Sequence, residues 1–257
     1  MANSVHTAAA TGFEAAADTY ANSRPDYPAA LDAWLTGTLH LRPGATVLDL
    51  GAGTGKFTPR LIATGATVIA VEPVSAMRQR LAHDLPNIRA IEGTADSIPL
   101  PDASLDAIVC AQAFHWFATP AALAEIHRVL KPGGRLGLVW NVRDMSVPWV
   151  AAIDELLQPH EGTAPRYVSG AWRKVFPAPG FSPLEESIFP HGHTGAPEQV
   201  IVGRQLSVSF IAALPAAEQD KLAAEIRALI AATPELAGRS EVTFPYVTSA
   251  FVATRLP

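Results

Sequence analysis

Cysteine is almost absent from this 257-residue chain, which contains only Cys110. One cysteine excludes an intramolecular disulfide, and a reducing, cytoplasmic location is therefore expected, with Cys110 buried in an apolar run. Long apolar runs are also absent, and residues 1–12 have neither the basic start nor the apolar core of a secretory signal. The sequence therefore predicts no membrane partner.

Basic residues are not in excess either. The chain has 19 Lys and Arg against 24 Asp and Glu, which gives a formal net charge of −5. This balance offers no electrostatic reason to expect a nucleic acid partner. No metal site is expected, because His191 and His193 have no cysteine or carboxylate at ligand spacing and two histidines do not make a metal site. A loop is expected at these histidines.

Short β-rich runs alternate with helix-like stretches over residues 45–142, as in a parallel sheet covered by crossover helices. Strands are expected at Thr46–Leu50, Thr67–Val71, Ile88–Ile91, Leu105–Ala111 and Arg135–Trp140, helices at Phe57–Thr64, Ser75–Asp84 and Pro120–Leu130, and turns at Pro43–Gly44 and Lys131–Gly134. This pattern predicts a cofactor-binding core.

The flanking segments predict additions to the same single domain, residues 1–257. Helices are expected at Phe13–Arg24, Asp32–Leu39, Val147–Gln158 and Pro215–Ala232, and strands at Leu184–Phe189 and Val242–Ala253. Pro245 indicates an edge or a bulge in the last strand. Residues 1–44 are expected to cover the site, and residues 143–257 to add strands with a helical cap inserted at about 197–234.

The strongest motif is the stretch Val47–Gly55, a buried strand that leads into a glycine-rich turn ahead of a helix. Glycines allow a ligand to approach the backbone closely. A dinucleotide-binding loop needs G-x-G-x-x-G, but Lys56 stands where the third glycine would be. A P-loop fails too, because Leu50 and Phe57 occupy its first and last positions. Another ligand, or a tight turn without one, remains open.

Two acidic residues follow the next strands. Glu72 ends the second strand about 20 residues beyond the glycine turn, where a carboxylate can accept hydrogen bonds from a ribose diol. Asp96 follows the third strand and could accept a hydrogen bond from an exocyclic amine such as that of adenine. A solvated loop charge and a turn aspartate are the alternatives.

In this order, the Gly51 loop, Glu72, Asp96 and the stretch Arg128–Gly134 resemble class I S-adenosylmethionine-dependent methyltransferases over roughly residues 47–140. The resemblance implies a Rossmann-like α/β three-layer sandwich, with a mainly parallel seven-stranded sheet, a final antiparallel strand and a helical cap. It implies S-adenosylmethionine as cofactor and S-adenosylhomocysteine as product. The cofactor-binding residues that it implies are Asp49, Gly51, Ala52, Gly53, Gly55, Glu72, Pro73, Met77, Ala95, Asp96, Gln112 and His115.

The roles implied by this resemblance follow the parts of the cofactor. The glycine loop would hold the methionine part, Glu72 the ribose, and Asp96 with Ala95 the adenine. Met77 would pack on the adenine ring or belong to the core.

The stretch Tyr20–Pro28 resembles a small-molecule subgroup of the family, the type 11 methyltransferases that include trans-aconitate methyltransferase-like enzymes. By this resemblance Tyr20 and Arg24 would close over the cofactor, with Arg24 near its carboxylate, since arginine pairs with carboxylates in a bidentate way. A surface arginine is the alternative.

The fourth strand ends in Gln112 and His115, which are expected beside the reacting sulfonium because ligands bind at the carboxyl ends of parallel strands. The aromatic residues Phe114, Trp116 and Phe117 could wall this pocket or pack on the next helix. Methyl transfer needs mainly alignment of its partners. His115 is the candidate catalytic base, and orientation or packing are its other possible roles.

The expected function is in-line methyl transfer from S-adenosylmethionine to a small-molecule acceptor, by a monomer or homodimer. One alternative is a protein of this fold that binds the cofactor and catalyses a reaction other than methylation. Another is a non-catalytic cofactor-binding protein. A macromolecular acceptor is disfavoured by the acidic balance of the chain.

Overall fold

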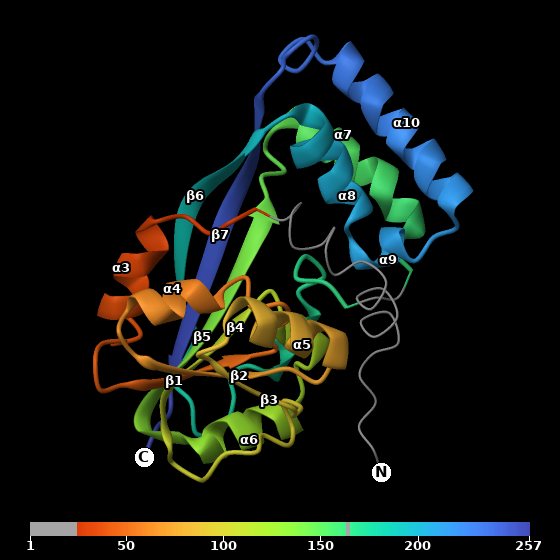
Figure 1. The fold of residues 1–257 in the computed structure, drawn as a ribbon. Coiled ribbons are helices and arrows are strands. Elements are labelled where there is room, and N and C mark those ends of the chain that lie inside the picture. Colours follow the sequence, from red (N-terminus) through yellow and green to blue (C-terminus); the bar gives the residue numbers. More distant parts are fainter. Residues whose placement is uncertain (1–24, 163–164) are drawn as a thin grey trace.

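The computed structural model describes residues 25–162 and 165–257, in which seven strands form one mixed sheet (Figure 1). The strands are β1 (Thr46–Leu50), β2 (Thr67–Val71), β3 (Arg89–Ile91), β4 (Leu105–Ala111), β5 (Leu130–Arg143), β6 (Glu185–Gly195) and β7 (Val242–Thr254). They are arranged in the order β3-β2-β1-β4-β5-β7-β6. Strands β1 to β5 pair in parallel, and β7 is antiparallel to both of its neighbours. The predicted sheet with a final antiparallel strand is confirmed.

Helices cover both faces of the sheet, because its central strands are apolar on both faces. Val47, Val109 and Val139 pack towards α3 (Ala30–Gly37) and α4 (Thr58–Ala63). The alternate residues, such as Leu48, Ile108 and Leu138, pack towards α6 (Pro120–Val129). Helix α5 (Ser75–Asp84) packs through Leu81 on Ala52 and Ala70.

The start of α6 shows why these helices begin where they do. Thr119 Oγ1 accepts a hydrogen bond from the Ala122 N–H at 3.1 Å, and Pro120 occupies the first turn, where no N–H is needed. The position of α6 follows from these local signals.

A separate group of helices packs at one end of the long strands β5, β6 and β7 (Figure 1). It comprises α7 (Pro148–Leu157), the π-helical turn η4 (Glu198–Gly203), α8 (Arg204–Leu206), α9 (Ser209–Ala212) and α10 (Ala216–Ala232). All but α7 are inserted between β6 and β7. Ile153, Ile201, Ile226 and Phe244 belong to their shared apolar cluster. We call these five elements the cap.

Three short 3₁₀ helices complete the secondary structure of the described residues. They are η1 (Phe114–Trp116), η2 (Gln158–His160) and η3 (Ala171–Val175). Two predictions about the strands were wrong: the loop at His191 and His193, and the edge or bulge at Pro245. His191 and His193 lie in β6 instead of a loop, since β6 pairs with β7 as far as Gly195. Pro245 lies in the internal strand β7, without a register shift.

The position of Pro245 has a simple physical reason. Its carbonyl accepts a hydrogen bond from the Asp144 N–H at 3.1 Å, so its missing N–H faces the point where β5 ends at Arg143. The proline therefore removes a donor only at the margin of that ladder.

The predicted turn Lys131–Gly134 lies within the bounds of β5. The pairing jumps from Leu105 with Leu130 to Ala107 with Arg135, so the four residues form a bulge. Cys110 is fully buried, as expected. The expected helix Phe13–Arg24 lies outside the described residues. No helix in residues 25–162 and 165–257 combines the length and the apolar character needed to cross a membrane.

Candidate functional site

A cavity of about 330 Å³ lies at the carboxyl ends of β1, β2 and β4, and we call it the cofactor cavity. Sequence reasoning places ligands of parallel sheets at this edge. The predicted site residues that line the cavity are Asp49, Gly51, Ala52, Gly53, Glu72, Pro73, Met77, Ala95, Asp96 and Gln112. They come from the ends of β1 to β4 and from the segments that follow these strands.

Two predicted residues among the described ones, Gly55 and His115, do not line this cavity. A Cβ added at Gly55 would lie 3.0 Å from Leu81 Cγ, so this glycine serves the packing of α5. His115 lines a neighbouring cavity instead. Tyr20 and Arg24 lie outside the described residues, although Pro25 and Tyr27 from the same motif line the cofactor cavity.

The glycine loop leaves its backbone open towards the cavity. Gly51 and Gly53 have φ values of +72° and +59°, which favour glycine. A Cβ at Gly51 would lie 2.8 Å from Ala113 Cβ, whereas the nearest atom to a Cβ at Gly53 is Met77 Sδ at 3.8 Å. Gly51 is therefore required by packing, and Gly53 leaves space that a ligand can fill.

Glu72 is held in the cavity wall by backbone donors. Its side chain is buried, Oε2 accepts a hydrogen bond from the Gly53 N–H at 2.9 Å, and Oε1 accepts one from the Val74 N–H at 2.8 Å. Burial raises the pKa of this carboxyl, against the lowering effect of these two hydrogen bonds. Each carboxylate oxygen can accept a second hydrogen bond, so both remain able to bind a hydroxyl.

Asp49 is buried at the end of β1, beside Glu72. Its Oδ2 accepts a hydrogen bond from the Thr58 hydroxyl at 2.7 Å, while its Oδ1 is buried without a partner. Burial raises the pKa of Asp49 to about 7, and the charge of Glu72 raises it further. An unpartnered acceptor in a cavity wall suits a ligand that donates a hydrogen bond or carries positive charge.

The rest of the cavity wall is mostly apolar. Met77 is buried and lines it, and Trp116 and Phe117 add aromatic surface. Phe114 is wholly buried and packs edge-on against Phe117 and Trp172, so it belongs to the core. Asp96 Oδ1 accepts a hydrogen bond from the Thr94 hydroxyl at 2.6 Å, which fixes the orientation of this carboxylate.

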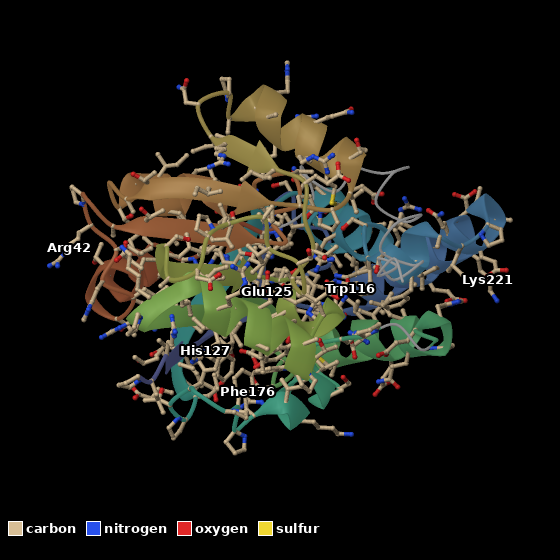
Figure 2. All side chains as sticks on the ribbon, turned by 90° about the horizontal axis from the view of Figure 1, so that it is seen from below. Arg42, Trp116, Glu125, His127, Phe176 and Lys221 are labelled. Atoms are coloured by element: carbon tan, nitrogen blue, oxygen red, sulfur yellow. The ribbon has the colours of Figure 1, made fainter. Side chains whose placement is uncertain are left out.

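A second cavity, of about 660 Å³, adjoins the first and is lined by the segment after β4, by the end of β5, by residues 158–162 and 165–168, and by part of the cap. The two cavities share the lining residues Gln112, Trp116, Asn141 and Arg204, which we call the junction. In Figure 2, Trp116 lies where the core meets the cap, whose helix α10 carries Lys221. A ligand in the second cavity can therefore meet one in the first.

His115 lines the second cavity and is fixed by a buried tryptophan. The indole N–H of Trp140 donates a hydrogen bond to His115 Nδ1 at 3.0 Å. Because an indole N–H can only donate, Nδ1 must be unprotonated, and neutral His115 carries its proton on Nε2. In this arrangement His115 donates from Nε2, which favours an orienting role. Its role as a base remains a prediction.

Comparison with known proteins identifies the family. A family model described as a methyltransferase domain matches residues 48–138. An uncharacterised methyltransferase-like protein of Schizosaccharomyces pombe is 39% identical over 93% of this chain and 93% of its own length. The chain belongs to the class I S-adenosylmethionine-dependent methyltransferases.

Solved structures agree with this methyltransferase fold. A structure described as a type II methyltransferase from Anaeromyxobacter dehalogenans has a TM-score of 0.67 and 26% identity, and the match covers 91% of this chain and 99% of that one. The [4+2]-cyclase SpnF matches with a TM-score of 0.56 at 17% identity over 96% and 95% of the two chains. The latter likeness shows the fold alone.

Sequence reasoning missed two junction residues of this methyltransferase. Asn141 donates from Nδ2 to the Asp26 carbonyl at 3.0 Å and accepts from the Thr248 hydroxyl at 2.6 Å. It directly follows the strand predicted to end at Trp140, so the rule of strand ends could have found it. Arg204 belongs to the cap, and no motif marks it.

Proposed function

We propose that this methyltransferase binds S-adenosylmethionine in the cofactor cavity and transfers its methyl group in line to a small-molecule acceptor in the second cavity. The supporting observation is that Glu72 and the unpartnered Oδ1 of Asp49 line one cavity beside the open Gly53. When bound, the cofactor supplies an electrophilic methyl group on a positively charged sulfur.

Each part of the cofactor has a chemical counterpart in the wall. Asp49 Oδ1 accepts from the ammonium of the methionine part, beside the open backbone of Gly53. The second acceptor sites of the Glu72 carboxylate take the ribose hydroxyls. Asp96 and Ala95 hold the adenine, and Met77 packs on its ring. Tyr20 and Arg24 complete the site from the N-terminal segment.

The junction residues bring the two reactants together. Gln112 has a φ of +58°, uncommon for a residue other than glycine, and its side-chain amide donates to the Asn141 carbonyl at 3.2 Å. This arrangement holds the strand-end side chain at the boundary of the cavities. Alignment of acceptor and methyl group can contribute about 7–11 kcal/mol in favourable cases. His115 orients the acceptor through its Nε2 proton.

A small molecule is favoured as acceptor because the second cavity has a volume of only about 660 Å³ and the chain is acidic. An acidic surface repels nucleic acid. We infer a cytoplasmic enzyme that acts as a monomer or homodimer.

Calorimetric titration with S-adenosylmethionine, S-adenosylhomocysteine and NAD tests the proposal. We expect binding of the two sulfur compounds and none of NAD. Formation of S-adenosylhomocysteine during incubation with a panel of small acceptors then measures transfer. Failure to bind either sulfur compound would refute the proposal, whereas binding without turnover of any acceptor would favour a non-methylating or non-catalytic protein of this fold.

A further inference from the structure

Arg204 is a buried cation without a counter-ion among the described residues. Arg204 is the first residue of α8 in the cap, and it is 8% exposed. Its Nε and Nη1 are buried and have no hydrogen-bond partners. A buried charge normally has an ionic or hydrogen-bonding partner, because its removal from water is unfavourable. Arg204 therefore lacks a partner that its burial requires.

The acidic residues beside Arg204 are engaged elsewhere. Arg143 donates to Asp154 and, at 2.7 Å, to Gln205 Oε1. Arg166 lies 2.5 Å from Glu161 Oε2 and 3.7 Å from Asp154 Oδ1.

Asp154 and Glu161 are the acids among the described lining residues of the second cavity. The three arginines of that lining, Arg143, Arg166 and Arg204, therefore outnumber the acids by one. The wall of the second cavity therefore has a net positive charge, and Arg204 is its arginine without an acidic partner among the described residues. Consistent with this, the nearby charge of Arg204 and, above all, burial lower the pKa of Arg143 to about 10.

The location of Arg204 indicates which kind of ligand could pair with its charge. Arg204 lines both cavities at the junction, where the two reactants of the proposed transfer would meet. A guanidinium pairs best with a carboxylate or a phosphate, which can accept charge-assisted hydrogen bonds. An anion here would also neutralise the excess charge of the wall.

We propose that Arg204 anchors an oxyanion group, a carboxylate or a phosphate, of the methyl acceptor. This assignment rests on the proposed function, since it takes the second cavity as the acceptor site. It makes Arg204 a specificity-determining residue that selects anionic acceptors against neutral ones of the same shape.

The test compares the wild type with three variants. Arg204→Met removes the charge with a side chain of similar length, Arg204→Lys keeps the charge, and Arg239→Gln is a control at an exposed arginine of the β6–β7 insertion. The probes are phenylacetate, phenyl phosphate and the neutral phenylacetamide. Their affinities are measured by calorimetry with and without saturating S-adenosylhomocysteine, and thermal unfolding of each variant shows that it is folded.

We expect at least one oxyanion probe to bind the wild type about ten to a hundred times more tightly than phenylacetamide, as one or two charge-assisted hydrogen bonds would give. Arg204→Met should abolish this preference, Arg204→Lys should keep part of it, and Arg239→Gln should keep all of it. The better of the two oxyanions identifies the anchored group. Because it removes an unpaired buried charge, Arg204→Met should also raise the unfolding temperature without ligand.

Three outcomes would overturn the assignment. These are equal or undetectable binding of the oxyanions and the amide, an oxyanion preference that survives Arg204→Met, and loss of S-adenosylhomocysteine binding in that variant. The last result would assign Arg204 to the carboxylate of the cofactor. If the wild type fails to bind S-adenosylhomocysteine but prefers the oxyanions without it, the anion site stands and the proposed function fails.

Discussion

The two adjoining cavities are built in different ways. The cofactor cavity is formed by strand ends and the turns that follow them, and its acid Glu72 is held by the backbone N–H groups of Gly53 and Val74. The second cavity is formed by side chains from the end of β5, from the segment after α7 and from the cap. Its arginine Arg143 is held by Asp154 and Gln205, which lie 11 and 62 residues away in the sequence.

The contacts that shape the cofactor cavity are thus close in the sequence for the most part, whereas those that shape the second cavity join distant residues. Backbone donors come with the turn, so a short motif specifies both the shape and the polarity of the cofactor cavity. The second cavity depends on which side chains, distant in the sequence, the fold brings together. Changes in the cofactor cavity should therefore affect a shared cofactor, and changes in the second should affect the choice of acceptor.

The largest effect is expected at the glycine loop. Gly53→Val places a branched side chain in the open space of the cofactor cavity and should abolish S-adenosylhomocysteine binding, as measured by calorimetry. Gly238→Val is the matched control, because Gly238 also has a positive φ, +71°, and open space around it. Both variants should carry a similar backbone strain of about 1–2 kcal/mol. Equal binding by both would remove Gly53 from the cofactor site.

A smaller loss is expected from Glu72→Gln. The amide group places an NH₂ where one of the two backbone donors of Gly53 and Val74 needs an acceptor. We expect binding of S-adenosylhomocysteine to weaken by about 1–3 kcal/mol. Glu92→Gln, at an exposed glutamate paired with Arg78, is the control and should bind normally. Normal affinity in Glu72→Gln would exclude its carboxylate from ribose binding.

Asp49 should make stability depend on pH. Because its folded pKa of about 7 lies above the ordinary aspartate value of 3.8, its contribution to stability is fully present below about pH 4 and is lost as pH rises to about 7. Asp49→Asn should remove this loss and gain stability relative to wild type between about pH 5 and pH 8. Urea unfolding at the two pH values measures the difference. An unchanged pH dependence in Asp49→Asn would show that Asp49 is ionised normally.

The last prediction concerns a single hydrogen bond to His115, which lines the second cavity, and its test is Trp140→Phe. This change removes the donor to His115 Nδ1, a hydrogen bond worth about 0.5–1.5 kcal/mol. Nitrogen chemical shifts of His115 should show the Nε2–H tautomer in wild type and a mixture of tautomers in the variant. A wild-type His115 protonated at Nδ1 would leave Nε2 free to accept a proton and would favour the role of His115 as a base.

The sequence was sufficient for most of the sheet and the cofactor cavity, because both depend on local patterns. The β2 and β4 runs and the Val47–Gly55 motif indicate strand, turn and helix directly. Long-range pairing decided the rest: β6 extends through His191 and His193 only because β7 lies opposite. Likewise, no local sequence pattern marks Arg204. It lacks an acidic partner among the described residues because Asp154 and Glu161 pair with Arg143 and Arg166.

The long ladder of β5, β7 and β6 has a mechanical consequence. β7 pairs with β5 from Arg135 to Arg143 and with β6 from Glu185 to Gly195, without a register shift in either ladder. Hydrogen-bonded strands that continue from the core into the cap resist bending and sliding. The ladder thus holds the cap, whose apolar cluster includes Val242, Phe244 and Tyr246 of β7, in a fixed position relative to the core.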